Sequence, residues 1–366
     1  MNNGDFDNTI NGTTMHGSDK KCPNCGGVMV FDPASGMLKC PYCDSVFDIT
    51  PDEEDDENGL EQDLFSAEFT DSTDWGTATR TIICKFCGGE SVYDANTLAT
   101  ECPFCGSNQV METDADSLAP FGVCTFKISK EKAASKFSEW IRKKLFCPSK
   151  AKKNCTPETF RGVYVPLWTF DTDTFSKFTA RYGIDRTYRD SEGNTRHTTD
   201  WYRVSGTHRE FIDDHPVLAS DRYDPALFEK LLPFDTAGNL LYKPEYMEGF
   251  AAEKYSIGLR AGWETAKTSI KKLLKKNITD RILRENGADR VDNLKFNTVF
   301  DNIKYKYLLA PLWISSFRYK DKVYNFMVNG ETGKTAGKAP VSPIRVAIAL
   351  LIAFAILFLI WKLVNS

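Results

Sequence analysis

Eight of the eleven cysteines could act together as metal ligands, because they form two copies of one pattern. In each copy, two CxxC pairs are separated by fourteen residues. A CxxC turn presents two thiolates from one tight loop, and four thiolates about 2.3 Å from an ion complete a closed tetrahedral site. The spacing therefore predicts two structural zinc ribbons with one Zn²⁺ ion each. The predicted ligands are Cys22, Cys25, Cys40 and Cys43 in the first ribbon, and Cys84, Cys87, Cys102 and Cys105 in the second.

The residues next to the thiols fit such ribbons. Gly-Gly follows Cys25 and Cys87 and one glycine follows Cys105, whereas Asp44 follows Cys43. Glycine allows the positive φ that turns the chain beneath a metal and directs backbone N–H groups toward sulfur. A unit of about thirty residues is too small to build a sufficient core, so bound metal must supply on the order of 10–16 kcal/mol of folding free energy.

Other uses of these cysteines fit the pattern less well. Disulfides require an oxidising compartment, and the polar residues 1–5 do not resemble a secretory signal. A redox CxxC would stand alone beside a βαβ pattern, and catalytic zinc would need an open coordination position. Iron in a rubredoxin-like site uses the same thiolates, so it stays an alternative to zinc.

The second strong signal is an uncharged, apolar stretch near the C-terminus, at residues 346–361. With Pro343 at the helix start and Lys362 able to extend toward headgroups, the span reaches about 20 residues, enough to cross a bilayer. A buried core helix is the alternative, but globular helices seldom lack a polar face over four turns. Residues 343–364 are therefore predicted to form one transmembrane helix that acts as a tail anchor.

The charges flanking this span predict its orientation. Lys334, Lys338 and Arg345 precede it, whereas Lys362 alone follows it, and positive charge favours the cytoplasmic side. Reduced metal-binding thiolates also require a reducing compartment. We therefore expect a single-pass protein of the cell membrane, in contact with lipid through its C-terminal helix and with its N-terminal body in the cytoplasm.

The remaining chain divides by composition into further segments. An acidic run begins at Asp52, and the next Lys or Arg in the sequence is Arg80. Such a run repels itself and stays extended. A bait for a basic partner is the alternative use of these acidic residues. The predicted organisation is a disordered tail (1–20), zinc ribbon 1 (21–50), an acidic linker (51–78), zinc ribbon 2 (79–112) and a body (117–338).

The body is predicted to be an α+β domain in which one unit occurs twice, in halves of about 117–215 and 247–338. Each half contains a helical pattern and then a strand with Pro-Leu-Trp, followed by hairpin strands. The first helix runs from a Ser129 cap to Phe146, and its apolar face comprises Ala133, Ala134, Phe137, Ile141 and Leu145. The second covers 264–278, and its apolar face comprises Ala266, Ile270, Leu273 and Leu274. Strands are expected at 162–170, 175–182, 201–208, 307–314, 316–319 and 323–328.

Several other residues are assigned structural roles. Trp168 and Trp313 adjoin strand prolines and are predicted to pack in the core. The remaining cysteines, Cys124, Cys147 and Cys155, are expected to be small buried or surface residues. The histidines form no recognisable motif, and we expect His208 and His215 to be satisfied surface residues.

Residues 330–335 resemble a phosphate-binding P-loop but lack its first glycine, because Val328 occupies that position. Asn329-Gly330 is instead a hairpin turn signal. We find no catalytic constellation in the sequence and therefore expect no enzymatic activity.

Four features occur together in this chain: two CxxC-x14-CxxC ribbons, a Tyr-Val-Pro-Leu-Trp strand (164–168), a later Pro-Leu-Trp strand (311–313) followed by the turn 329–334, and a terminal apolar span. This combination resembles a bacterial family of double zinc-ribbon, membrane-anchored proteins. Members are often labelled as relatives of the primosomal helicase PriA or as transcription-factor-IIB-type ribbons, although this chain lacks a helicase P-loop. The resemblance also implies association with membrane scaffolds of the flotillin (SPFH) type and an adaptor role.

Charge helps to separate the functional hypotheses. Lys21 and Lys39 in ribbon 1 are outnumbered by acidic residues, and so are Arg80 and Lys85 in ribbon 2. DNA affinity comes mostly from cations that neutralise phosphate, so nucleic-acid binding is not favoured. Basic residues gather instead at 142–153 and 267–276, where they could contact anionic headgroups or simply be solvated.

The leading hypothesis is a membrane-anchored cytoplasmic adaptor or scaffold protein whose ribbons recruit a protein partner. The first alternative is a membrane-tethered DNA-binding replication or transcription factor. The second alternative is an enzyme that acts on lipid or envelope precursors.

Overall fold

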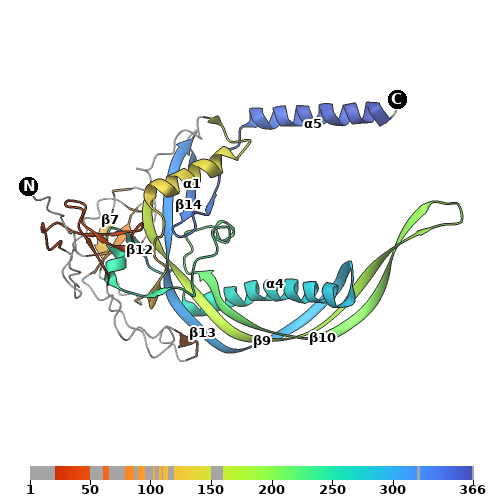
Figure 1. The fold of residues 1–366 in the computed structure, drawn as a ribbon, viewed down its shortest axis with the longest axis horizontal. Helices are drawn as coiled ribbons and strands as arrows, with labels where there is room; N and C mark the ends of the chain where they lie inside the picture. Colours follow the sequence, from red (N-terminus) through yellow and green to blue (C-terminus); the bar gives the residue numbers. More distant parts are fainter. Residues whose placement is uncertain are drawn as a thin grey trace, which may run out of the picture.

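The computed structural model describes residues 21–49, 61–65, 79–85, 90–94, 102–103, 107–108, 110–113, 119–149, 160–319 and 322–364. In this part of the chain, β1, β2 and β3 form a small sheet and twelve further strands form one large sheet. A long helix, α5 (Pro343–Val364), extends away from the body (Figure 1). The coarse prediction of a small cysteine-bearing strand region, a β-rich body and an apolar C-terminal helix is thereby confirmed.

The elements follow one another in this order: β1 (Val30–Asp32), β2 (Met37–Lys39), β3 (Val46–Phe47), β4 (Gln62–Asp63), β5 (Thr79–Cys84), β6 (Glu90–Asp94), β7 (Val110–Thr113), β8 (Gly122–Val123), α1 (Lys130–Arg142), β9 (Arg161–Arg189), β10 (Thr195–Leu218), α3 (Pro225–Phe228), β11 (Leu240–Leu241), the 3₁₀ helix η4 (Pro244–Met247), β12 (Ala251–Glu253), α4 (Leu259–Asn286), β13 (Arg290–Tyr319), β14 (Lys322–Asn329), β15 (Thr335–Gly337) and α5.

Three very long strands dominate the body. β9 has 29 residues, β10 has 24 and β13 has 30. β9 lies between the other two and pairs antiparallel with both. The predicted strands 162–170 and 175–182 are therefore parts of one continuous strand, β9, and 201–208 is part of β10. The sequence patterns marked the apolar parts of these strands but not their length.

Irregularities in the pairing curve this sheet around α4. The register of β10 against β9 shifts between Ile212 and His215, where Asp214 has a φ of 45°. The register of β13 against β9 shifts twice, and Asn293 and Asn302 have positive φ at these places. Because a β-bulge bends its strand and increases the local twist, the three strands form an arch with α4 along its inner side (Figure 1).

Helix α4 fills the inner side of the arch with residues at helical spacing. Its buried residues are Gly262, Trp263, Ala266, Ile270, Leu274, Ile278 and Ile282. The predicted helix 264–278 is thus confirmed but extends about three turns further in total. Leu273 is more than a third exposed, so its predicted place on the buried face is wrong. It neighbours Leu274 in sequence, and because successive helical residues point about 100° apart, Leu273 points away from the direction in which Leu274 packs.

Helix α1 begins as predicted, because the Ser129 side chain accepts a hydrogen bond from the Lys132 amide. Ala133, Ala134, Phe137 and Ile141 are buried. The helix ends at Arg142, before Leu145, which is 77% exposed. The prediction that Leu145 belongs to the buried helical face is therefore wrong.

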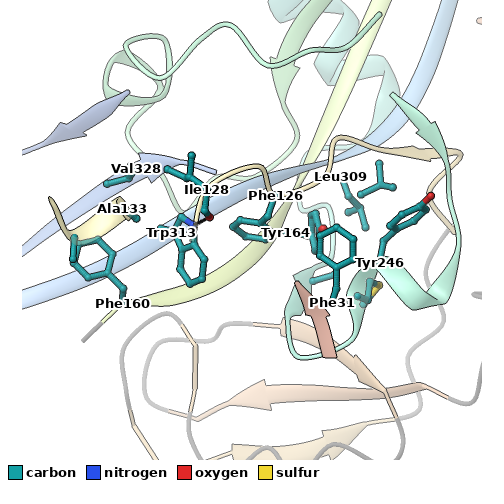
Figure 2. Close-up of a cluster of buried hydrophobic side chains, with 14 of the residues drawn as sticks. Phe31, Phe126, Ile128, Ala133, Phe160, Tyr164, Tyr246, Leu309, Trp313 and Val328 are labelled. Atoms are coloured by element: carbon teal, nitrogen blue, oxygen red, sulfur yellow. Dashed lines mark hydrogen bonds between the residues drawn. The ribbon is translucent and has the colours of Figure 1, made fainter. Parts of the chain in front are cut away.

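The two tryptophans of the Pro-Leu-Trp strands are buried, which confirms their predicted role in packing. The Trp168 indole donates to the Ile257 carbonyl at 2.8 Å, and the Trp313 indole donates to the Ile128 carbonyl at 3.0 Å. Ile257 directly precedes the N-cap of α4, and Ile128 directly precedes the N-cap of α1. Figure 2 shows Trp313 beside Ile128 within a cluster of buried hydrophobic side chains.

Short parallel strands complete the centre of the sheet. β8, which precedes α1, pairs parallel with β13 at Leu308 and Leu309. β12, which precedes α4, pairs parallel with β9 at Val163 and Tyr164. Each helix is therefore preceded by a short strand that joins the long strand following the other helix.

The turn 329–334 forms the hairpin that the sequence predicted. β14 pairs antiparallel with β15, and the Asn329 amide donates to the Lys334 carbonyl at 2.8 Å. The buried Asn329 side chain donates to the Leu231 and Pro233 carbonyls and accepts from two amides of the turn. Asn329 thus connects the hairpin to the loop at 231–235.

The predicted linker and second ribbon are joined to the body. β4, inside the predicted linker 51–78, pairs with β13 at Lys304 and Tyr305. β6 pairs antiparallel with β12, so β5, β6 and β7 continue the large sheet. An unpaired strand edge can pair with a further strand. Here β4 pairs with β13, and β6 pairs with β12. For residues 61–65 this differs from the expectation of a free, extended linker.

A group of charges, of which Asp171, Asp214 and Lys306 are buried, lies where β4 meets the arch. Glu61 forms a 2.8 Å ion pair with Lys304, and Lys306 pairs with the buried carboxylate of Asp214. The Asp171 carboxylate accepts from the Asp214 amide at 2.6 Å. Burial, the hydrogen-bonded Glu61 carboxyl and the Asp214 charge raise the pKa of Asp171 to about 7.

We predict that this carboxyl makes the attachment of β4 dependent on pH. The Glu61 carboxyl contributes to this raised pKa only while β4 is attached, so the attached state binds the Asp171 proton more tightly than the detached state does, and deprotonation favours detachment. Protection of the Leu64 amide, which donates to the Ile303 carbonyl, should therefore fall as the pH rises from 6 to 8. Hydrogen exchange, corrected for its intrinsic pH dependence, measures this protection.

The variant Asp171→Asn should keep the Leu64 amide protected at pH 8, because the amide side chain stays neutral and can donate to Glu61. Asp301→Asn, on the exposed part of β13, is the matched control and should behave like the wild type. Equal loss of protection in Asp171→Asn and in the wild type would contradict the assignment to Asp171.

Candidate metal centre

The four cysteines of the first quartet lie together. Their sulfur atoms are all within 4.8 Å of one another. The Cys22–Cys43 and Cys25–Cys40 sulfur pairs are each 3.5 Å apart. Four thiolates bound at about 2.3 Å around a tetrahedral ion would be about 3.8 Å apart. The donor set and its spacing therefore fit a metal ion such as zinc.

Two similar backbone turns place these thiols. The Cys22 amide donates to the Gly27 carbonyl at 2.7 Å, and the Cys40 amide donates to the Ser45 carbonyl at 2.9 Å. After the second cysteine of each pair the chain takes a positive φ, 74° at Gly26 and 58° at Asp44. Aspartate tolerates this conformation better than most residues, and a 3.0 Å ion pair with Lys39 holds Asp44 in place.

Hydrogen bonds around the sulfur atoms shift the pKa values of Cys43 and Cys25 in opposite directions. The Ser45 hydroxyl, 3.2 Å from the Cys43 sulfur, and the Ser45 amide lower the pKa of Cys43 to about 6. The Gly27 amide acts to lower the pKa of Cys25, but the thiols of Cys40 and Cys43 outweigh it and raise the pKa to about 12. Without a cation, the Cys25 thiol therefore keeps its proton at neutral pH, and metal binding must release that proton.

Asn24 and Ser45 form an outer contact that the cysteine pattern did not reveal. The Asn24 side-chain amide donates to the Ser45 hydroxyl at 2.7 Å, and that hydroxyl contacts Cys43. Such outer partners orient metal ligands and adjust their basicity. A polar residue inside the first CxxC pair and another two positions after the second pair were the only sequence signals for this contact.

The first ribbon is fixed to the body on one side. The Phe31 amide donates to the Glu248 carbonyl at 3.0 Å, and the Phe31 ring makes an edge contact with Tyr246 at 5.8 Å between centroids. Figure 2 shows Phe31 on its strand pointing into the cluster of buried side chains beside Tyr246. Cys22 and Cys40 are buried, whereas Cys25 and Cys43 are exposed. The metal centre thus lies between the docked side of the ribbon and solvent.

Half of the second quartet falls within the described residues. Cys84 and Cys102 are both buried, and the Cys102 amide donates to the Ser107 carbonyl at 2.7 Å. This bond has the same spacing as those made by Cys22 and Cys40. Cys87 and Cys105 lie outside the described residues, so the second metal site stays a prediction.

The other candidate residues have separate structural surroundings. Cys124 is buried, and desolvation raises the pKa of its thiol well above the usual value. Cys147 is also buried, and Cys155 lies outside the described residues. His208 pairs with Glu210 at 2.8 Å, whereas His215 contacts the Ser269 hydroxyl at 2.6 Å. Burial lowers the pKa of His215, so this histidine is less exposed than predicted.

The C-terminal helix has the dimensions of a membrane span. Within the 21 residues Pro343–Leu363, an 18-residue stretch has a mean hydropathy of 2.7, and none of that stretch is buried in the protein. A core helix would be covered by other elements. The helix is therefore long and apolar enough to cross a bilayer.

Comparison with known proteins finds a distant relative whose similarity extends over most of the chain. The chain is 29% identical over 334 residues to the uncharacterized protein YdjG of Bacillus subtilis (strain 168), which covers 89% of this chain and 91% of that protein. No protein-family model matches the sequence. No solved structure matches either.

We predict that the first quartet holds one metal ion. The double variant Cys22→Ser/Cys40→Ser removes two of four thiolates and should lower the metal content of the full-length protein by about one ion per chain. Elemental mass spectrometry on the purified protein measures this content. Cys124→Ala, which removes a buried thiol outside the quartet, should leave it unchanged.

The same variant tests whether the metal holds the ribbon on the body. Loss of the ion should expose the segment around Phe31 to limited proteolysis, because so small a sheet has little core of its own. A ribbon that stays protease-resistant without metal would show that contacts with the body suffice.

Proposed function

We propose that this protein is a membrane-anchored cytoplasmic adaptor that presents a zinc-held surface to a protein partner. The observation that carries the proposal is the position of the first ribbon: one side is packed on the body, while its metal-binding turns carry exposed apolar side chains. A fixed ribbon of this kind has the properties of a recognition element.

Zinc is the ion that the thiol donor set favours, since closed four-thiolate sites are the usual structural zinc sites. We extend the assignment to both quartets and therefore to two ions. The support for the second is the Cys102–Ser107 hydrogen bond, which repeats the backbone turn of the first ribbon. Bound zinc would stabilise each ribbon and leave no open coordination position for catalysis.

The partner-binding surface that we propose lies at Tyr42 and Val28. Tyr42 is 76% exposed and Val28 is 49% exposed. The Tyr42 ring lies over Gly27, where an added Cβ would be only 2.4 Å from it. Tyr42 and Val28 are therefore exposed apolar side chains that both neighbour Gly27, one in space and one in sequence. Tyrosine is a frequent anchor in protein interfaces because it combines a large apolar area with a polar end.

The membrane part of the proposal places α5 across the bilayer with the body on the cytoplasmic side. Lys334, Lys338 and Arg345 precede the apolar span and are the flanking charges expected on that side. The resemblance described above makes a flotillin-type scaffold the first partner to test.

We also propose that the body arose by duplication. The supporting correspondence is that β8, α1 and β9 occur in the same order as β12, α4 and β13. In each half the tryptophan of Pro-Leu-Trp donates to the carbonyl that directly precedes the N-cap of the other half's helix, Trp168 to Ile257 and Trp313 to Ile128.

The adaptor role predicts a partner that depends on Tyr42. In Tyr42→Ser the loss of an exposed aromatic anchor should cost about 2 kcal/mol of binding free energy, which lowers recovery of the partner more than tenfold. The tagged full-length protein is isolated from native membranes in mild detergent, and the bound proteins are quantified by mass spectrometry. Tyr188→Ser, on an exposed tyrosine of β9, is the matched control.

Two outcomes would redirect the proposal. An unchanged set of bound proteins in Tyr42→Ser would exclude this ribbon surface as the recognition site. Association that disappears after nuclease treatment would instead support the DNA-binding alternative.

A further inference from the structure

The segment after α1 is fastened to the beginning of the membrane helix. The Arg345 guanidinium donates to the Leu145 carbonyl at 3.1 Å, the Cys147 carbonyl at 2.8 Å and the Ser149 hydroxyl at 2.8 Å. The Ser342 amide donates to the Phe146 carbonyl at 2.8 Å. These four bonds hold residues 143–149, which we name the juxtamembrane turn, beside the point where α5 leaves the body.

The backbone of the juxtamembrane turn faces α5, while its apolar side chains remain uncovered by protein. Leu145 is 77% exposed and Phe146 is 41% exposed. On the other side of the junction, Val341 and Ile344 are also largely exposed. Four large apolar side chains from two distant parts of the sequence therefore gather where the apolar helix begins.

The same turn carries positive charge. Arg142, Lys143 and Lys144 are exposed at the end of α1, and residues 140–149 contain no Asp or Glu. The Lys144 ammonium lies 4.6 Å from the centre of the Trp140 ring. Exposed apolar groups next to cations and a half-buried tryptophan are the composition that favours the boundary between headgroups and acyl chains.

We propose that the juxtamembrane turn is a second membrane contact, in which Leu145 and Phe146 enter the interface of an anionic bilayer while Lys143 and Lys144 bind its phosphate headgroups. The inference rests on the proposed transmembrane role of α5. The bilayer is the occupant that the geometry selects, because Arg345 fixes the turn at the start of the apolar span. Figure 1 shows the end of α1 beside the start of α5, so this contact would set α1 close to the membrane surface.

Photocrosslinking in nanodiscs tests this contact on the full-length protein. The photoreactive residue p-benzoylphenylalanine replaces Phe146, Phe354 or Phe211, one at a time, in nanodiscs of phosphatidylcholine and phosphatidylglycerol. Phe354 lies within α5, and Phe211 is an exposed residue of β10. Mass spectrometry of the irradiated protein should find lipid adducts at positions 146 and 354 and none at 211.

Charge variants test the headgroup contact. Lys143→Glu/Lys144→Glu should lower the adduct yield at position 146 several-fold in nanodiscs that contain phosphatidylglycerol, and much less in phosphatidylcholine alone. Lys272→Glu/Lys275→Glu, which reverses two exposed lysines of α4, should leave that yield unchanged. An unchanged yield in the first variant would overturn the electrostatic part of the inference.

The other outcomes separate this inference from the proposed function. Adducts at 354 without adducts at 146 would refute the juxtamembrane contact and leave the membrane anchor intact. Adducts at 211 equal to those at 146 would also refute it, since the contact would then be unspecific. No adducts at 354 would overturn the transmembrane anchor and the inference with it.

Discussion

The antiparallel pairing of β9 with β13 is the constraint on which the rest of the body depends. The two strands are joined from Arg161 to Gly183 although their residues are separated by more than one hundred positions in the chain. Pairing over such a separation is costly in chain entropy and must be repaid by burial on the faces of the sheet. Both helices contribute to that burial, and the indoles of Trp168 and Trp313 connect the strands to the helix starts. The arch, helix α4 on its inner side and the short parallel strands therefore stabilise one another.

The first ribbon is stabilised differently, because it is much smaller than the body. Its three short strands cannot bury enough surface alone, so its stability is divided between the thiolate cluster and the contact of Phe31 with Tyr246. Cys22 and Cys40 belong to the buried cluster that joins the ribbon to the body, whereas Tyr42 is exposed to solvent. The metal centre and the exposed surface are thus two results of the same packing arrangement.

Local patterns in the sequence predicted those features whose causes are local. The CxxC spacing located the first thiolate cluster, Ser129 located the start of α1, and Asn329-Gly330 located a hairpin. Features that depend on distant residues were missed. Nothing near residue 62 indicates that β4 joins β13, because the acidic residues of that segment suggest solvation. The partner of Glu61 is Lys304, which lies on a strand far away in the sequence. The length of β9 was not predicted, because exposed polar residues alternate with buried ones along its second half. In that half α4 covers only one face of the strand.

The connection between the body and α5 has a mechanical consequence. The residues between β15 and α5 are held by an ion pair of Lys338 with Asp224 at 3.1 Å and by the Ser342 amide on Phe146. A flexible tether would let a bound partner explore a hemisphere above its attachment point, whereas a connection held at these two points restricts how far the body can swing relative to α5. With α5 in the bilayer as proposed above, this restriction would limit the range of heights above the membrane at which the ribbon can meet a partner.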